Sequence, residues 1–288
     1  METSDLLKRV RRIEIKTKAL TNNVFAGEYH SAFKGRGMSF AEVREYQPGD
    51  DVRDIDWHVT ARMNRPYVKV FEEERELTLM LLIDVSASQQ FGTHDRTQRE
   101  LTAEVAATLA FSAMKNNDKI GVIFFTDRIE KFIPPQKGRR HVLRIIRELL
   151  DFHPQGGGTN VAQALEYLVK VQRKHAIVFL LSDFLTQTDF SRQLLVAARR
   201  HDVVALRLYD RCMEQIPDVG LLKVKDAETG REMVIDTSST AVRRHQLLWW
   251  AKHQALLDEL FRKHGVDSTL MATDSDYVKP LINLLARR

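Results

Sequence analysis

The chain has 288 residues, of which 43% are hydrophobic and 29% are charged, and its net charge is +5. This length and composition suit one large globular domain or two modest ones with a packed core. No apolar run approaches the roughly 18 residues of a membrane span, and the first residues lack the apolar region of a signal peptide. We therefore expect no stable membrane insertion.

The cysteine count and the charge pattern narrow the class of protein further. The single Cys212 cannot form an internal disulfide, which favours a reducing compartment and a cytoplasmic protein. Basic clusters are present, but acidic residues are interspersed with them, and aromatic and basic residues do not interleave as they do in RNA-binding surfaces. We therefore expect a solvated, mixed-charge surface and no nucleic-acid partner.

The first quarter of the chain differs in composition and residue pattern from the rest. Residues 4–20 carry apolar side chains at helical spacing and predict an amphipathic helix. Residues 24–76 are dense in aromatic residues, charges and turn signals, and 67–71 alternate as a half-exposed strand does. We therefore expect an amino-terminal region, 1–76, that contains this helix and a small β-rich segment, followed by a core domain, 77–288.

Strands and helices alternate through the core domain. Residues 78–83 form a nearly unbroken apolar run, which is typical of a strand buried on both faces of a parallel sheet. Further strands are expected near 120–125, 129–133, 177–181, 203–209 and 268–271, and helices near 96–116, 139–151, 161–173, 189–200, 240–263 and 276–287. A hairpin near 221–236 interrupts the series. This order predicts an α/β fold with a doubly wound, mainly parallel sheet.

Three polar clusters follow predicted strands or precede predicted helices. Asp84, Ser86 and Ser88 come directly after the first core strand, Thr159 follows the glycines 156–158, and Asp183 ends the strand near 177–181. Because loops at one edge of a doubly wound sheet converge, we expect these five side chains to lie close together. The three glycines permit backbone angles closed to other residues, so Thr159 is the side chain we expect to move.

The clusters offer oxygen ligands alone. Hydroxyls and carboxylates without His or Cys argue against Zn²⁺ and for a hard cation, with Mg²⁺ expected and Mn²⁺ or Ca²⁺ as alternatives. The competing interpretation is that each cluster is a polar turn that ends a strand and caps a helix. The residues alone leave both interpretations open.

Other groups of polar residues favour structural roles. Asp50, Asp51, Asp54 and Asp56 could form a second metal site, but they lack the pattern of an EF-hand loop, and three arginines nearby favour charge pairing. Trp57 is expected to anchor this segment on the sheet. The glycine loop lacks the ending of a phosphate-binding loop. The histidines that a hydrolase could use are His58, His94, His141 and His153.

Taken together, the fragments DVSAS, GGGT and LLSD resemble the metal-ion-dependent adhesion site of von Willebrand factor A domains. The segment GRGMSFAEVREYQPGDDVRDIDWHVTAR, followed by YVKVFEEE and this motif, resembles the domain-of-unknown-function family fifty-eight, whose members join such a signature to a von Willebrand A-like core. Gln89 departs from the apolar residue that many von Willebrand A domains carry after the last serine, so we expect altered local packing there.

The resemblance implies a protein-interaction module and no enzyme. It implies that a divalent cation held by Asp84, Ser86, Ser88, Thr159 and Asp183 binds a carboxylate of a protein partner. It further implies an adaptor or co-chaperone role beside a MoxR-type AAA+ ATPase or its client. Two alternatives stay open: a metal-dependent hydrolase that uses the same site, and a structural scaffold with a vestigial site.

Overall fold

The computed structural model describes residues 10–15, 17, 29, 32, 38–73, 77–93, 96–186, 188–225 and 230–288. These residues belong to two compact units. One unit runs from Lys34 to Leu77, and the other combines Met1–Phe33 with Thr78–Arg288. This division differs from the expected one, because the first 33 residues group with the core. Arg139 contributes to this grouping, because its Nε and Nη2 donate to Glu14 Oε1 at 2.9 and 2.7 Å.

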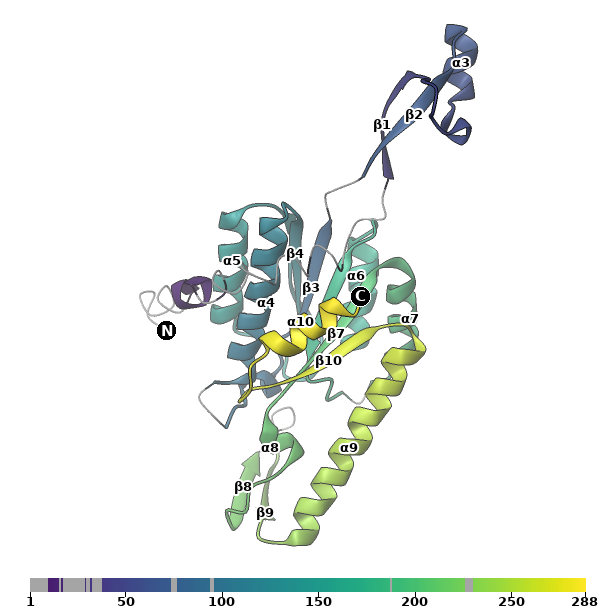
Figure 1. Ribbon diagram of the computed structural model, residues 1–288. Helices are drawn as coiled ribbons and strands as arrows, with labels where there is room; N and C mark the ends of the chain where they lie inside the picture. Colours follow the sequence, from purple (N-terminus) through teal and green to yellow (C-terminus); the bar gives the residue numbers. More distant parts are fainter. Residues whose placement is uncertain are drawn as a thin grey trace. The chain divides into compact units, whose positions relative to one another are not determined.

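A six-stranded sheet forms the centre of the larger unit (Figure 1). Its order is β10 (Asp267–Ala272), β7 (Asp202–Tyr209), β6 (Ile177–Ser182), β3 (Thr78–Asp84), β4 (Lys119–Phe125) and β5 (Ile129–Gln136). The first five strands are parallel, and β5 pairs antiparallel with β4 at the edge. The expected α/β fold class, with a doubly wound and mainly parallel sheet, is confirmed.

Continuous apolar sequence explains the central strands. Every residue of β6 is buried, as are all residues of β3, β4 and β7 except the first of each. Helices cover both faces, as Figure 1 shows: α4 (Gln98–Lys115), α5 (Arg139–Asp151), α6 (Val161–Val171), α7 (Ser191–Arg200), α9 (Thr240–Lys263) and α10 (Val278–Ala286). One core cluster joins β3, β4, β6 and β7 to α6, α7 and α9. Of the described helices, none is long and apolar enough to cross a membrane.

The connectivity reverses direction between the two central strands. After β3 the chain proceeds to β4 and β5 on one side, and from β6 it proceeds to β7 and β10 on the other. β3 and β6 are adjacent and parallel, with Leu79 paired to Ile177 and Ile83 to Leu181. The carboxyl ends of two such strands form the switch point at which doubly wound folds bind ligands.

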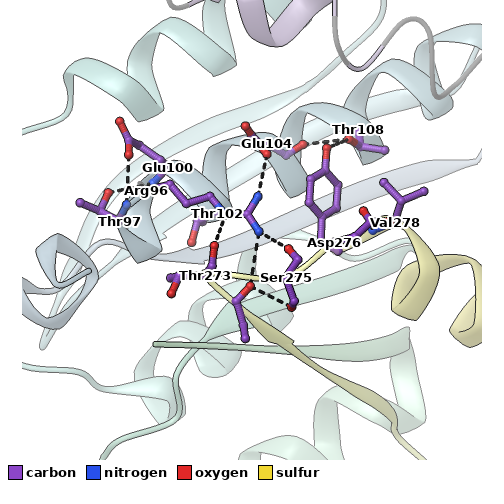
Figure 2. A network of polar contacts seen from close by, with 12 residues as sticks. Arg96, Thr97, Glu100, Thr102, Glu104, Thr108, Thr273, Ser275, Asp276 and Val278 are labelled. Carbon is purple, nitrogen blue, oxygen red and sulfur yellow. Dashed lines mark hydrogen bonds and ion pairs between the residues drawn. The ribbon is translucent and has the colours of Figure 1, made fainter. Parts of the chain in front are cut away.

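An arginine network ties the start of α4 to the turn after β10 (Figure 2). Arg96 donates to the backbone carbonyls of Thr273, Ala272 and Ser275, and it pairs with Glu104 at 3.1 Å. Thr97 and Glu100 form a capping box at the start of α4. These contacts fix one end of α4 on the sheet edge that bears the polar clusters.

A hairpin and an overhanging helix extend from the same carboxyl edge. The short helix α8 (Arg211–Glu214) follows β7, and β8 (Leu221–Lys225) and β9 (Glu232–Asp236) form the expected antiparallel hairpin. α9 then returns to the sheet (Figure 1). Its 24 residues span about 36 Å, whereas the six residues of β10 span about 20 Å, so the first turns of α9 project beyond the strands.

The smaller unit contains an antiparallel pair and a short helix. β1 (Met38–Glu45) pairs with β2 (Tyr67–Glu73), and the 3-10 turn η2 (Val52–Asp54) and the helix α3 (Trp57–Met63) lie between them in the chain. The side chain of Asp56 caps α3 by accepting from His58 N and Val59 N. Trp57, the first residue of α3, is 67% exposed.

Candidate functional site

The five predicted site residues come to one edge of the sheet. Asp84 is the last residue of β3, and the 3-10 turn η3 (Ala87–Gln90) that follows contains Ser88. Asp183 comes directly after β6, and Thr159 lies just before α6. All five are buried, including the hydroxyls of Ser86 and Ser88, which lie 3.1 Å apart.

Asp84 is the centre of the polar contacts. Its Oδ1 accepts from the backbone N–H of Ser86 at 2.9 Å. Its Oδ2 accepts from Ser182 Oγ at 2.6 Å and from Thr159 Oγ1 at 3.3 Å. Burial, and then the charge of Asp183, raise the pKa of Asp84 from 3.8 to about 7, although hydrogen bonds from Ser182 and Ser86 oppose the shift.

Asp183 has one oxygen that the fold leaves without a partner. Its Oδ1 accepts from Leu185 N at 3.0 Å, whereas its buried Oδ2 has no hydrogen-bond partner among the described residues. Burial raises the pKa of Asp183, against the opposing effects of the Leu185 N–H and the Ser88 hydroxyl. A buried carboxylate oxygen without a donor or cation costs free energy, so this atom points to a group that binds there.

Ser182 belongs to the site although the sequence analysis assigned it no role. Its hydroxyl donates to Asp84 and accepts from Phe184 N at 3.0 Å, so it links the ends of β3 and β6. Its position directly before Asp183, at the end of an apolar strand, was the available signal. The same loop holds Phe184 at φ 57, a left-handed conformation that is unusual for a bulky residue.

The glycine loop is fixed by close packing and by backbone hydrogen bonds. A side chain at Gly156 would place a Cβ 1.8 Å from Asp127 Oδ1 and 2.3 Å from Thr126 Oγ1. Gly157 O accepts from Ala87 N at 3.2 Å, and Thr159 O accepts from Thr186 Oγ1 at 2.8 Å. The described glycines with positive φ are 49, 138, 220, 230 and 265, so the loop at 156–158 contains no left-handed glycine in this conformation.

The donor set fits a hard divalent cation. It consists of three buried hydroxyls (Ser86, Ser88, Thr159) and two buried carboxylates (Asp84, Asp183), one of which has an unpartnered oxygen. In the described ranges no three or more His, Cys, Asp or Glu residues are grouped to hold a metal, so any ion here would depend on the hydroxyls. Such oxygen ligands suit Mg²⁺, Mn²⁺ or Ca²⁺.

The acidic segment of the smaller unit makes turns and ion pairs. Arg44 binds Asp50 through two nitrogens at 2.8 and 2.6 Å, which lowers the pKa of that carboxyl. Asp51 caps the 3-10 turn through Arg53 N, and Asp56 caps α3. The described aspartates of this segment therefore form charge pairs and turns, in agreement with the favoured interpretation.

The described histidine candidates give no support to a catalytic group. His141 Nε2 lies 2.8 Å from Ile120 O, near the start of β4 and thus at the sheet edge opposite the site. His58 and His153 are exposed, and His94 lies outside the described residues. Gln89, in contrast, is buried and accepts from Thr102 Oγ1 at 3.1 Å, so a polar network replaces apolar packing there.

The chain is similar in sequence to several known proteins and in fold to solved structures. The chain is 31% identical over 287 residues to "Uncharacterized protein Rv1480" of Mycobacterium tuberculosis, covering 98% of this chain and 90% of that protein. It is 27% identical to YeaD of Bacillus subtilis over 179 residues, covering 62% and 42%. An aerotolerance-related membrane protein from Bacteroides fragilis aligns with a TM-score of 0.52 and 13% identity, covering 74% of this chain and 100% of that one.

The matches extend across both units. The B. fragilis structure, at its low identity, supports the fold alone. The M. tuberculosis relative aligns over nearly the whole chain, so its similarity includes the signature segment as well as the sheet. Residues 42–255 match the family model described as "Protein of unknown function DUF58", and the chain belongs to that family.

Proposed function

We propose that this protein is a metal-dependent protein-interaction module that binds a carboxylate of a partner protein through a divalent cation. The observation that carries the proposal is the buried Oδ2 of Asp183, which has no partner in the described part of the chain and lies at the same sheet edge as Asp84. Two carboxylates buried at one edge repel each other unless a proton or a cation is present. A divalent cation would satisfy both.

The five side chains would hold the ion in two different ways. Ser86, Ser88 and Thr159 would bind it through their hydroxyls, and Asp84 and Asp183 would act largely through water and by orienting the hydroxyls. When bound, the metal supplies an electrophilic centre that accepts an anionic oxygen. Because the direct ligands are mostly neutral, much of the ion's charge stays uncompensated, which favours an acidic side chain from a partner.

The family resemblance supports a particular class of partner. Members of this family resemble proteins encoded beside MoxR-type AAA+ ATPases, so we propose that the partner is such an ATPase or its client. In this role the protein is an adaptor or co-chaperone in the cytoplasm. The exposed carboxylate that it recognises would be a Glu or Asp on the surface of the ATPase.

A metal-dependent hydrolase is the second candidate. The specific observation in its favour is Asp84, whose pKa is raised to about 7, the range that suits a general base. Against it, both oxygens of Asp84 already accept hydrogen bonds from Ser86, Ser182 and Thr159. Turnover of peptide, ester or phosphoester substrates that requires Mg²⁺ and is lost in Asp84→Ala would favour the enzyme. A vestigial site would show no heat when Mg²⁺ is titrated in.

The test is the affinity of a purified MoxR-type ATPase from the same genome for this chain, measured with Mg²⁺ and with a chelator. We expect removal of divalent metal to weaken binding by about tenfold or more, since coupling between two ligands is commonly 1–3 kcal/mol. Ser86→Ala should weaken binding to a similar extent. Ser268→Ala, at the start of β10 and thus at the opposite sheet edge, is the matched control and should bind as the wild type does.

Reciprocity gives a second measurement on the same samples. If Mg²⁺ raises the affinity of the chain for the ATPase, the ATPase must raise the affinity of the chain for Mg²⁺ by the same factor. Equal affinity with and without divalent metal, for both wild type and Ser86→Ala, would show that the site is not the binding surface.

A further inference from the structure

The positive charge of the chain is concentrated in two segments of the larger unit. Residues 8–18 and 137–151 contain eleven Lys or Arg and three Asp or Glu, so these 26 residues carry +8, whereas the whole chain carries +5. The rest of the chain is therefore acidic in balance. The mixing of both charge signs that the sequence predicts for the surface does not hold for these two segments.

The described parts of the two segments lie side by side. The first forms an amino-terminal helix, described at 10–15 and 17, and the second contains α5. Arg139, the first residue of α5, pairs with Glu14 of the amino-terminal helix at 2.7 Å. Figure 1 shows that helix, in purple, beside α5. Because Glu14 is buried in this contact, one of the three acidic residues is absent from the outer surface.

Three arginines form a row along the outer face of α5. Arg140, Arg144 and Arg147 are spaced by four and three residues, so they share one face, and all three are exposed. The buried residues of α5 lie on the opposite side. Arg144 approaches Glu148 at 3.9 Å, whereas Arg140 and Arg147 have no ion pair with any described residue. Asp151, one turn beyond Arg147, ends the row. Like charges at this spacing destabilise a helix, so folding does not explain the row.

The outer face of the amino-terminal helix adds two arginines and one apolar side chain. Arg11 and Arg12 lie four and three positions before Ile15, and all three are exposed, Ile15 at 63%. Val10 and Ile13 are buried on the other side of the helix. Neither arginine forms an ion pair within the described ranges. We call the combined surface of the two helices the basic face; its residues are Arg11, Arg12, Ile15, Arg140, Arg144 and Arg147.

We propose that the basic face binds the surface of a membrane that contains anionic phospholipids. Lipid phosphates offer anionic oxygens, which a guanidinium binds through two parallel hydrogen bonds. A basic helix with an apolar side chain on its exposed face suits the boundary between the lipid headgroups and the acyl chains. Ile15 would enter this boundary while the arginines stay among the headgroups. The protein therefore lies on the membrane and does not span it.

A lipid surface fits the basic face better than a nucleic acid does. Proteins that bind single strands stack the bases on aromatic side chains, and proteins that bind duplexes contact phosphates through polar groups. The described residues of the two segments expose Ile15 but no aromatic side chain. An isoleucine gains nothing beside a hydrated phosphate backbone, whereas transfer of its side chain out of water at a lipid surface is favourable.

The expected contact is reversible and sensitive to salt. Attraction between exposed charges and a charged surface falls off within the Debye length, which is about 10 Å at 0.1 M salt and about 3 Å at 1 M. One apolar side chain adds too little to hold the protein on the membrane without this attraction. The basic face contains none of the five polar residues at the sheet edge, so this proposal goes beyond the metal-dependent function and does not rest on it.

The first experiment is flotation of the full chain with lipid vesicles. Vesicles of phosphatidylcholine with about 30% phosphatidylglycerol supply the anionic surface, and vesicles of phosphatidylcholine alone supply the neutral one. At about 0.1 M salt we expect binding to the anionic vesicles alone, and we expect the affinity to fall at least about tenfold at about 0.5 M. Equal binding to both kinds of vesicle, or binding to neither, would overturn the proposal.

Charge reversal locates the contact on the protein. The double variant Arg140→Glu/Arg147→Glu should bind anionic vesicles about twentyfold more weakly or worse, since each basic residue near such a surface contributes about fivefold. Arg192→Glu/Arg199→Glu is the matched control, because it makes the same charge change at exposed positions seven apart on α7. The control should bind as the wild type does, and equal losses in both double variants would show that net charge alone matters. Circular dichroism checks that each variant is folded.

A third variant distinguishes a lipid surface from another polyanion. Ile15→Ser should weaken binding to anionic vesicles by about tenfold, because it removes the side chain that leaves water. It should not change the affinity for a short duplex DNA, which offers phosphates without an apolar phase. Wild-type protein that binds the duplex more tightly than the vesicles, or Ile15→Ser that binds vesicles as the wild type does, would identify the basic face as a nucleic-acid surface or a general polyanion surface instead.

Discussion

Two buried carboxylates, Asp84 and Asp183, set the electrostatics of the candidate site. Burial raises the pKa of both groups, and the charge of Asp183 raises the pKa of Asp84 further. Hydroxyl donors such as Ser182 lower the cost of the Asp84 charge without removing it. The protein without metal therefore holds Asp84 in a position that favours the protonated form, and a bound cation would reverse that preference.

Asp84→Asn should therefore stabilise the metal-free protein at neutral and alkaline pH. The pKa of Asp84 rises from 3.8 to about 7 on folding, so its favourable contribution is fully present below 3.8 and is lost as the pH rises through about 7. Asn carries no such dependence. The free energy of unfolding of the variant minus that of the wild type should thus grow across this interval, by at most about 1.4 kcal/mol for each unit of pKa shift.

Urea unfolding in the presence of a chelator, repeated across this pH interval, measures the difference. Asp189→Asn, at an exposed carboxyl whose pKa is lowered by Ser191, is the control and should lack this alkaline gain. A difference for Asp84→Asn that does not change with pH would mean that the carboxyl is ionised equally in both states.

Individual residues were predictable from sequence where strand ends place them. Asp84 and Asp183 follow apolar runs, and parallel pairing of those runs brings both to one edge. The unpartnered oxygen of Asp183 was not predictable, because it depends on which donors the neighbouring loops supply.

At the scale of elements, the spacing of apolar residues and the capping residues explain which predicted helices agree with the structure. α5 and α9 have the predicted bounds, 139–151 and 240–263, because each carries a regular apolar stripe. α3 was missed because its seven residues include no buried one, so no apolar stripe marks it. Its side-chain cap, Asp56, was the remaining signal, and it stood in a run of aspartates with several competing roles.

Arg96 is the residue on which the fastening of α4 to the turn after β10 depends. Its guanidinium serves three carbonyls and Glu104 at once, while its side chain is only 19% exposed (Figure 2). We expect Arg96→Ala to destabilise the protein by about 2–4 kcal/mol, because it leaves several carbonyls of a half-buried turn without a donor. Arg96→Lys should recover little, since an ammonium cannot reproduce the planar fork.

Chemical denaturation of the three proteins measures the loss. Arg147→Ala, at an exposed position on α5, is the matched control and should lie within about 0.5 kcal/mol of the wild type. Full recovery by Arg96→Lys would indicate that a single charge, rather than the fork of hydrogen bonds, holds the turn.

At the scale of the whole molecule, the order of strands and helices was predictable from the sequence. Individual side-chain contacts between segments distant in the chain were not. The alternation of strands and helices predicted a doubly wound sheet, and its two windings meet between β3 and β6. The membership of residues 1–33 in the larger unit was not predictable, because the contact between Glu14 and Arg139 joins positions 125 apart. Local patterns carry no information about such contacts.

Divalent metal should stabilise the whole fold to an extent that depends on pH. Binding at the sheet edge requires the carboxylates of Asp84 and Asp183 in their charged form, so the cation competes with protons and releases them. Since the pKa of Asp84 is about 7, stabilisation by Mg²⁺ should grow as the pH rises toward that value and level off above it. At saturation with Mg²⁺ in about a hundredfold excess over Kd, the gain in the free energy of unfolding should reach about 2.7 kcal/mol.

Thermal unfolding of the full chain with Mg²⁺ or chelator, at several pH values, measures this gain. Asp84→Asn should weaken this pH dependence, because one of the two competing protons is gone, while an equal Mg²⁺ effect at every pH in the wild type would place the ion elsewhere.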